Sequence, residues 1–309
     1  MLIELNRVTK LYGRVIGTND ISISLPAGAY GLLGPNGSGK STLLNLIMGQ
    51  LEPTIGSVRV LGESPINNAK LFRCLGFCPS HEGMYANISG YQWVRYLQEL
   101  QGHTRREAKR LTEAAMERVG MTYAMHRNIS GYSRGMRQRT KLAQAIAHEP
   151  DFLILDEPFN GLDPIARHEV TTALRSWIDE GKSLLLASHV LHEVESVTQS
   201  FLLICGGRLL ASGTASEVQE LLADLPNEIT VRSNSPHQVA TLAWALETCD
   251  AVRVEGDAVH VTTRDPSRLV MELPTWAMTR DIKIQEVGSA DESLQTLFNT
   301  LLRIHRGEI

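Results

Sequence analysis

Short apolar runs and amphipathic stretches alternate along the first two thirds of this chain. The runs at residues 152–155 and 184–187 are continuous and strand-sized, which is typical of strands covered on both faces. Residues 21–25 instead alternate between apolar and polar side chains, as a half-buried strand does. The periodicity predicts amphipathic helices over residues 90–100 and 104–119. Helices between buried strands predict a layered α/β domain with a parallel sheet.

The pattern changes near Asp224-Leu225-Pro226, so we expect one domain over residues 1–222 and a smaller one over residues 226–309. The second part predicts, in order, strand 228–232, helix 236–246, strands 251–255 and 258–263, helix 266–278 and strand 282–287. This βαββαβ order is the ferredoxin-like pattern of a small α+β domain. A last amphipathic helix is expected over residues 291–302.

Charge and hydropathy narrow the class of protein. The net charge of −4 gives no overall basic field, so we expect no nucleic-acid partner. No apolar run approaches the roughly 18 residues that span a bilayer, and residues 1–5 lack the layout of a signal peptide, so we expect a cytoplasmic chain. The cysteines are scattered, and Cys74 and Cys78 flank a strand-like segment; buried thiols are expected there rather than a metal clip.

A glycine-rich loop between a predicted strand and a predicted helix carries the first chemical signal. Residues 34–41 fit the phosphate-binding pattern G-x-x-x-x-G-K-[S/T], between the apolar run 29–33 and the helical stretch 41–48. Glycines let backbone N–H groups turn toward an anion, and the helix N-terminus adds partial positive charge. Lys40 is expected to reach the β- and γ-phosphates of a nucleotide, and the Ser41 hydroxyl to bind Mg²⁺.

Two acids follow a buried strand. Asp156 and Glu157 come directly after the apolar run 152–155, and a strand end of this kind delivers carboxylates beside the phosphate loop of a neighbouring strand. Asp156 is expected to complete the Mg²⁺ shell opposite Ser41. Glu157 points elsewhere and is a candidate to polarise an attacking water.

Taken together, these motifs resemble those of ABC-type ATPases over residues 1 to about 215. The resemblance implies a P-loop NTPase fold with a helical subdomain, and ATP hydrolysis with Mg²⁺ as cofactor. It implies a catalytic role for His189, which follows the second apolar run, beside Glu157. It implies an ATP-binding set formed by Tyr12, Gly34, Pro35, Asn36, Gly37, Ser38, Gly39, Lys40, Ser41 and Thr42.

The resemblance implies that other residues contact the nucleotide bound by a second copy of the chain. The segment 132–139 aligns with the family signature and keeps Ser133 and Gly135 before a helix over residues 136–148. Asp163 lies in a loop that resembles the one coupling the two sites of a dimer. Ser80 stands where the family normally has glutamine, and its shorter side chain is expected to act only through a bridging water, with His81 as a substitute.

Two functions agree with these motifs. In the first, two copies close around ATP and drive a separate integral membrane permease, as in the similar ABC-2 type exporters, from the cytoplasmic face of the inner membrane. Residues 83–96 are the expected permease contact, although Trp93, Tyr96 and Leu97 alternatively form the buried stripe of a helix. The alternative is a soluble non-transport ABC ATPase that acts on a macromolecular complex; the chain lacks the second nucleotide core, coiled-coil insertion or basic patch typical of that class. Residues 226–309 are expected to serve dimerisation or regulation.

Overall fold

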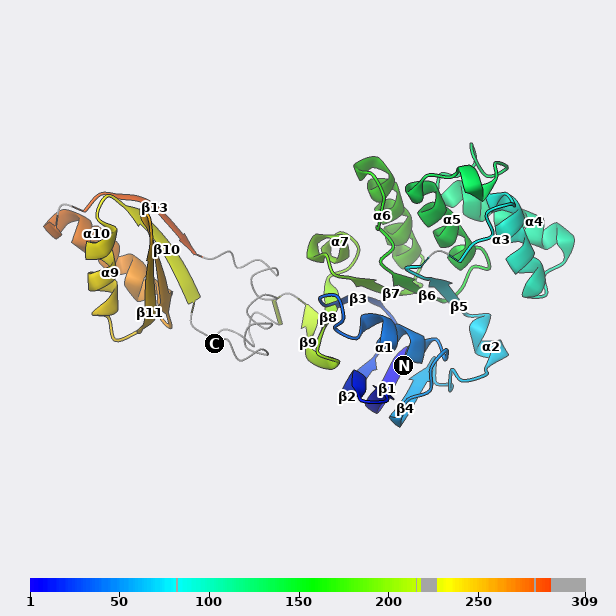
Figure 1. The fold of residues 1–309 in the computed structure, drawn as a ribbon, viewed down its shortest axis with the longest axis horizontal. Coiled ribbons are helices and arrows are strands. Elements are labelled where there is room, and N and C mark those ends of the chain that lie inside the picture. The colour runs from blue at the N-terminus through cyan, green and yellow to red at the C-terminus, as the bar shows by residue number, and fades with distance from the viewer. Residues whose placement is uncertain (82, 215, 218–226, 281, 290–309) are drawn as a thin grey trace. The chain divides into compact units, whose positions relative to one another are not determined.

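The chain divides into two compact units, Met1–Thr214 and Ala215–Ile309 (Figure 1). The computed structural model describes residues 1–81, 83–214, 216–217, 227–280 and 282–289. The expected domain boundary at residues 222–226 lies outside these described residues. Each unit is therefore considered by itself.

The first unit is built on a mostly parallel sheet in the order β5-β6-β7-β3-β8-β9. The first five strands in this order run parallel to their neighbours, and β9 pairs antiparallel with β8. Strands β6 and β7 are buried along their whole length, which confirms the interpretation of their continuous apolar runs. The bounds are β3 Ala29–Leu33, β5 Leu75–Cys78, β6 Phe152–Asp156, β7 Ser183–Ser188, β8 Ser200–Cys205 and β9 Arg208–Thr214.

The strand order corrects one expectation. Strand β7 lies between β3, which leads into the glycine loop, and β6, which ends in the two acids. The acids therefore do not lie on the strand next to the phosphate loop. They still reach the start of α1 (Lys40–Ile47), where Ser41 Oγ donates to Asp156 Oδ2 and Lys40 Nζ lies 3.9 Å from Glu157 Oε1.

Helix α1 lies between the parallel sheet and a second, antiparallel sheet. Its strands lie in the order β2-β1-β4, with bounds β1 Ile3–Tyr12, β2 Val15–Leu25 and β4 Ile55–Val60. Ile21 and Leu25 are buried and Ser22 and Ser24 are exposed, so β2 is half-buried there as its alternation predicts. Helix α1 contacts β2, β4 and β6, and its apolar residues join the two sheets in one core.

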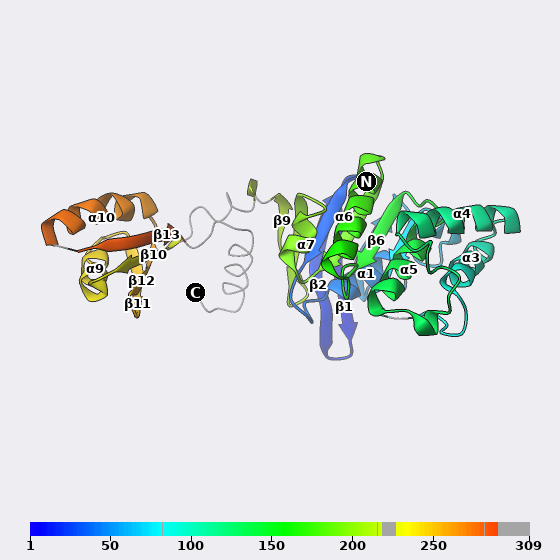
Figure 2. The same cartoon turned by 90° about the horizontal axis from the view of Figure 1, so that it is seen from above.

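Helices cover the opposite face and one end of the parallel sheet (Figure 2). α6 (Pro164–Asp179) and α7 (Leu191–Glu195) contact β7, and α7 also contacts β3. α3 (Gly90–Leu100), α4 (Arg105–Arg118) and α5 (Arg134–Ile146) pack against one another as the helical subdomain. Short helices α2 (Ala69–Phe72) and η1 (Ile129–Gly131) complete the connections.

Helix α3 turns a different face to the core from the one expected. Its fully buried residues are Gly90, Val94 and Gln98. Trp93 and Leu97 are only half-buried, and Tyr96 remains 50% exposed. The expectation of a buried stripe is wrong for Tyr96, because the buried face lies one position further along the helix.

The second unit has the predicted element order β10 (Asn227–Ser233), α9 (Pro236–Trp244), β11 (Cys249–Glu255), β12 (Ala258–Thr263), α10 (Pro266–Arg280) and β13 (Ile284–Ser289). Its sheet is antiparallel in the order β11-β12-β10-β13, as the ferredoxin-like pattern requires. Apolar residues from the sheet and both helices form a separate core, including Val231, Val259 and Leu269. The expected helix over residues 291–302 lies outside the described residues.

Because each unit has its own core, we expect a chain ending at residue 225 to fold and to bind ATP with the affinity of the full chain. Isothermal titration and thermal unfolding of the two forms would measure this. An insoluble truncated chain, or one that no longer binds nucleotide, would show that the second unit is part of the first unit's fold.

Candidate functional site

A cavity of about 400 Å³ opens where the glycine loop meets the ends of β5 and β6. Its walls come from the β1–β2 turn, from the loop and first turn of α1, and from the residues that follow β5 and β6. The lining residues are Tyr12, Val15, Ile16, Gly17, Asn36, Gly37, Ser38, Gly39, Lys40, Ser41, Thr42, Ser80, Asp156 and Glu157. The structure thus brings together most of the ATP-binding residues predicted from the sequence, although Gly34 and Pro35 do not line the cavity.

The glycine loop needs its glycines for steric reasons. Gly39 has φ +107°, and a Cβ there would lie 2.5 Å from the backbone oxygen of Gly17. A Cβ on Gly34 would overlap the backbone oxygen of Ile204. Gly39 also caps α1 without a side-chain hydrogen bond, so the first N–H groups of α1 have no side-chain cap from this residue. Such a helix end favours an anion.

Lys40 places a buried ammonium at the centre of the cavity. Its Nζ donates to the carbonyl oxygens of Gly34 at 2.6 Å and Pro35 at 3.3 Å. Glu157 Oε1 lies 3.9 Å away. Burial lowers the pKa of Lys40, while the negative charges of Glu157 and Asp156 act in the opposite direction. A phosphate entering the cavity would meet a cation that is already held in place.

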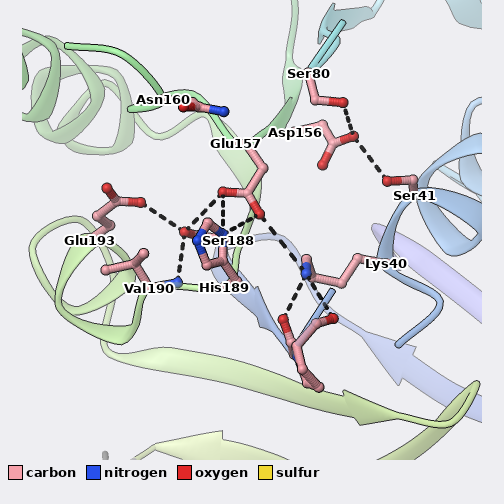
Figure 3. Close-up of polar contacts among 12 residues, drawn as sticks. Lys40, Ser41, Ser80, Asp156, Glu157, Asn160, Ser188, His189, Val190 and Glu193 are labelled. Atoms are coloured by element: carbon pink, nitrogen blue, oxygen red, sulfur yellow. Dashed lines mark hydrogen bonds and ion pairs between the residues drawn. The ribbon is translucent and has the colours of Figure 1, made fainter. Parts of the chain in front are cut away.

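Three oxygen-bearing side chains converge on one side of Lys40 (Figure 3). Asp156 Oδ2 accepts hydrogen bonds from Ser41 Oγ at 3.2 Å and from Ser80 Oγ at 2.9 Å. Ser80 thus contacts Asp156 directly, and His81 is exposed. That Ser80 reaches Mg²⁺ or the attacking water through a bridging water stays a prediction. Hydroxyl and carboxylate oxygens are the ligands that Mg²⁺ prefers, so this group fits that ion.

Glu157, the residue after Asp156, turns from this oxygen group toward Lys40 and His189 (Figure 3). Its φ of +51° is unusual for a residue other than glycine, and it turns the side chain away from that of Asp156. His189 Nδ1 lies 2.9 Å and 3.0 Å from the two carboxylate oxygens. The structure thus brings the two predicted catalytic residues together, between the ends of β6 and β7 (Figure 3).

Tyr12 lies at the mouth of the cavity. Its ring is 45% exposed, and its hydroxyl lies 3.5 Å from Thr42 Oγ1. The ring covers Gly17, where a Cβ would lie 2.7 Å from the nearest ring carbon. A flat, half-exposed ring at this place can stack on the base of a nucleotide whose phosphates lie in the loop.

Three predicted residues lie outside the cavity lining and form a second group. Ser133 is the N-cap of α5, and its hydroxyl accepts a hydrogen bond from the N–H of Met136 at 3.2 Å. Asp163 is the N-cap of α6 and accepts from the N–H of Ala166 at 2.8 Å. The starts of the two helices lie close together. A Cβ on Gly135, two residues after Ser133, would lie 3.4 Å from the backbone oxygen of Gly161, two residues before Asp163.

Several polar residues that support the site were not singled out from the sequence. Ser188 Oγ lies 2.8 Å from Glu193 Oε2 and 3.4 Å from Glu157 Oε2, and it accepts from the N–H of Val190. Gln138 donates to the oxygen of Pro158 at 2.9 Å, and Lys141 donates to the loop that carries Ser80. The sequence does not reveal that Gln138 and Lys141 are buried, because polar residues at these positions of α5 are equally typical of an exposed helix face.

Among the residues that the structure describes, no group of three or more His, Cys, Asp and Glu side chains is placed to hold a metal ion. His192 Nε2 lies 3.4 Å from Arg167 Nη1. Cys78 is buried, which raises the pKa of its thiol to about 12, whereas Cys74 is only half-buried.

The sequence is similar to ATP-binding proteins of ABC transporters. The family model described as ABC transporter matches residues 18–160. The ABC transporter ATP-binding protein YxlF of Bacillus subtilis is 36% identical over 243 residues, which are 79% of this chain and 76% of that protein. The bacitracin transport ATP-binding protein BcrA of Enterococcus faecalis is 37% identical over 71% of each chain. The Nod factor export ATP-binding protein I of Rhizobium johnstonii is 29% identical over 90% of this chain and 89% of its own.

Solved structures show the same fold. An ATP-binding subunit of an ABC transporter matches with a TM-score of 0.66 and 25% identity, over 72% of this chain and 93% of its own. The dimeric ABC transporter cassette MJ0796 matches with a TM-score of 0.64 and 20% identity, over 69% of this chain and 98% of its own. Both likenesses confirm the P-loop fold of the first unit.

We expect Lys40→Ala to weaken ATP binding by roughly 10- to 100-fold, because hydrogen bonds to charged groups are worth about 1.5–3 kcal/mol. Calorimetry or fluorescent-nucleotide titration would measure the affinity. Lys109→Ala is the matched control, since exposed Lys109 pairs with Glu113 on α4 at 3.8 Å and does not line the cavity. Unchanged affinity in Lys40→Ala would mean that the nucleotide binds elsewhere.

Proposed function

We propose that this chain, which belongs to the ABC transporter ATP-binding family, hydrolyses ATP between two copies of itself and thereby drives a separate membrane permease. Family membership makes the chain an ABC-type ATPase. The proposal concerns its site residues, its assembly and what it drives. The observation that carries it is the meeting of Lys40 and Ser41 with Asp156 and Glu157 at one cavity.

ATP would lie in this cavity with its phosphates in the glycine loop and its base on Tyr12, both of which line it. The N–H groups of the loop and of the first turn of α1 would surround the phosphates. Lys40 would exchange its loop carbonyls for β- and γ-phosphate oxygens. Ser41, Asp156 and Ser80 would hold Mg²⁺, which supplies neutralisation of phosphate charge when bound.

Glu157 is the candidate general base. It would accept a proton from water while the water oxygen bonds to the γ-phosphorus and the bond to the β–γ bridging oxygen breaks. Its contact with His189 fixes the carboxylate, and Lys40 lies between it and the phosphate loop. His189, which is 47% exposed, would meet the γ-phosphate from the same side.

A second copy of the chain would complete the site. Ser133, Gly135 and Asp163 stand together at the starts of α5 and α6 but outside the cavity. Helix starts suit phosphate binding, so these residues would contact the nucleotide held by the partner copy. The cassette MJ0796, which shares the fold, has been solved as a dimer.

The permease is proposed from the relatives and from an exposed apolar surface. Two relatives are named for bacitracin transport and Nod factor export, and export through an ABC-2 type permease is the direction we propose. Among the described residues, no helix is long and apolar enough to cross a membrane. The chain would therefore bind the permease at the cytoplasmic face of the inner membrane. Tyr85, Tyr96 and Leu100 are 66%, 50% and 65% exposed and offer the contact.

We expect Glu157→Gln to slow hydrolysis by about 10²- to 10⁴-fold, the usual contribution of a positioned general base, while ATP still binds. The trapped ATP should hold two copies together, which size-exclusion chromatography with light scattering would detect. Glu195→Gln changes another glutamate outside the cavity lining and should leave turnover unchanged. If the Glu157→Gln protein stays monomeric with ATP and keeps normal turnover, Glu157 is not the general base and ATP does not hold two copies together.

We expect the double variant Met84→Asp and Tyr85→Asp to lose membrane association while keeping ATP affinity. Tyr85 is exposed, with its ring edge against Trp93, so a charge there should disrupt an apolar contact more than the fold. Membrane fractions of cells with and without the co-expressed permease would measure this, with Ile55→Asp as the control at an exposed apolar residue of β4. If the double variant still associates with membranes, or if the wild-type chain does so without any integral membrane protein, a soluble non-transport ATPase would be favoured.

A further inference from the structure

A buried lysine holds the loop that carries Ser80. The side chain of Lys141, on α5, is only 2% exposed. Its Nζ donates to three successive carbonyl oxygens, those of Pro79 at 2.8 Å, Ser80 at 3.1 Å and His81 at 3.4 Å. An ammonium has three N–H donors, and burying one is unfavourable unless they are hydrogen-bonded. The loop after β5 therefore has a fixed cationic anchor on α5.

The position of this loop matters because serine is short. Ser80 Oγ contacts the same Asp156 oxygen that accepts from Ser41, so it belongs to the oxygen group proposed for Mg²⁺. A serine side chain has a single carbon between its backbone and its hydroxyl. A small shift of the loop would carry Oγ out of reach, whereas a longer side chain could follow the site by changing its rotamer.

We propose that Lys141 is a positioning residue that holds Ser80 at the cation and nucleotide site. Lys141 fixes the backbone of residues 79–81, and this backbone fixes Ser80 Oγ on Asp156. The inference rests on the proposed function, since it takes Ser41, Asp156 and Ser80 as the Mg²⁺ group. It adds a residue that touches neither the nucleotide nor the ion.

The neighbouring turn of α5 supports the same arrangement. Gln138, three residues before Lys141, donates to the backbone oxygens of Pro158 at 2.9 Å and Glu157 at 3.4 Å. One face of α5 therefore binds the backbone of both loops that supply the site, the loop after β5 and the loop after β6. Residues three apart share a helix face, so the two anchors move together with the helix.

The test is the Mg²⁺ dependence of nucleotide binding rather than turnover. In the full-length protein, Lys141→Met should raise the Mg²⁺ concentration needed for half-maximal binding of a fluorescent ATP analogue by roughly tenfold. Binding of the analogue in EDTA should not change. Ser80→Ala should raise the Mg²⁺ requirement to the same degree, and the double variant should show no further increase, because both changes remove the same contact.

Two further variants separate positioning from folding. Lys141→Gln keeps an N–H donor and should lie between wild type and Lys141→Met. Ser80→Gln in the Lys141→Met background should restore the Mg²⁺ dependence, since its longer side chain can follow a displaced site. Lys182→Met is the control, because Lys182 lies over the Trp177 ring and bonds the exposed carbonyl of Glu149. Thermal unfolding would confirm that each variant is folded.

Opposite results would overturn the inference. A normal Mg²⁺ dependence in folded Lys141→Met would show that the lysine only fills the core. Additive effects of Lys141→Met and Ser80→Ala would show that the lysine does not act through the serine. Wild-type protein that binds no Mg²⁺–nucleotide would instead refute the proposed function, so the two failures are distinguishable.

Discussion

The first unit is organised around one buried positive charge. The Lys40 side chain is only 7% exposed, and an ammonium so deeply placed must be surrounded by oxygen. Two loop carbonyls accept hydrogen bonds from it, and the Glu157 carboxylate after β6 lies 3.9 Å from it. This requirement explains why an apolar strand ends in adjacent acids. The left-handed conformation of Glu157 turns its carboxylate toward Lys40 and His189, whereas the carboxylate of Asp156 contacts Ser41 and Ser80.

The elements and the loop that surrounds Lys40 could be predicted from the sequence, but the strand order could not. Continuous apolar runs such as those of β6 and β7 identify buried strands without saying which strand is the neighbour of which. The sequence therefore placed the acids on a strand adjacent to β3, where β7 in fact lies. The direct contact of Ser80 with Asp156 was missed for a related reason. It depends on how close the backbone of the β5 loop comes, and that distance is set by Lys141, far along the chain.

Arg134, between Ser133 and Gly135, joins two loops. Arg134 Nη2 bonds Asn160 Oδ1, and its side chain packs over Gly161, where a Cβ would overlap it. Arg134 thus joins the start of α5 to the loop before α6. The two helix starts that carry Ser133 and Asp163 form one surface, so a partner's nucleotide would meet both or neither.

Helix α5 then connects this surface to the chain's own cavity. Ser133 caps its first turn, and Gln138 and Lys141 bind the backbones behind Glu157 and Ser80 further along. A helix transmits displacement along its length because its hydrogen bonds resist bending. If the start of α5 moves when a partner's ATP arrives, the loops that hold the chain's own base and cation group must move with it. The two nucleotides of a dimer would in this way be coupled through buried hydrogen bonds to backbone carbonyls, which depend on helix position rather than on any change of charge.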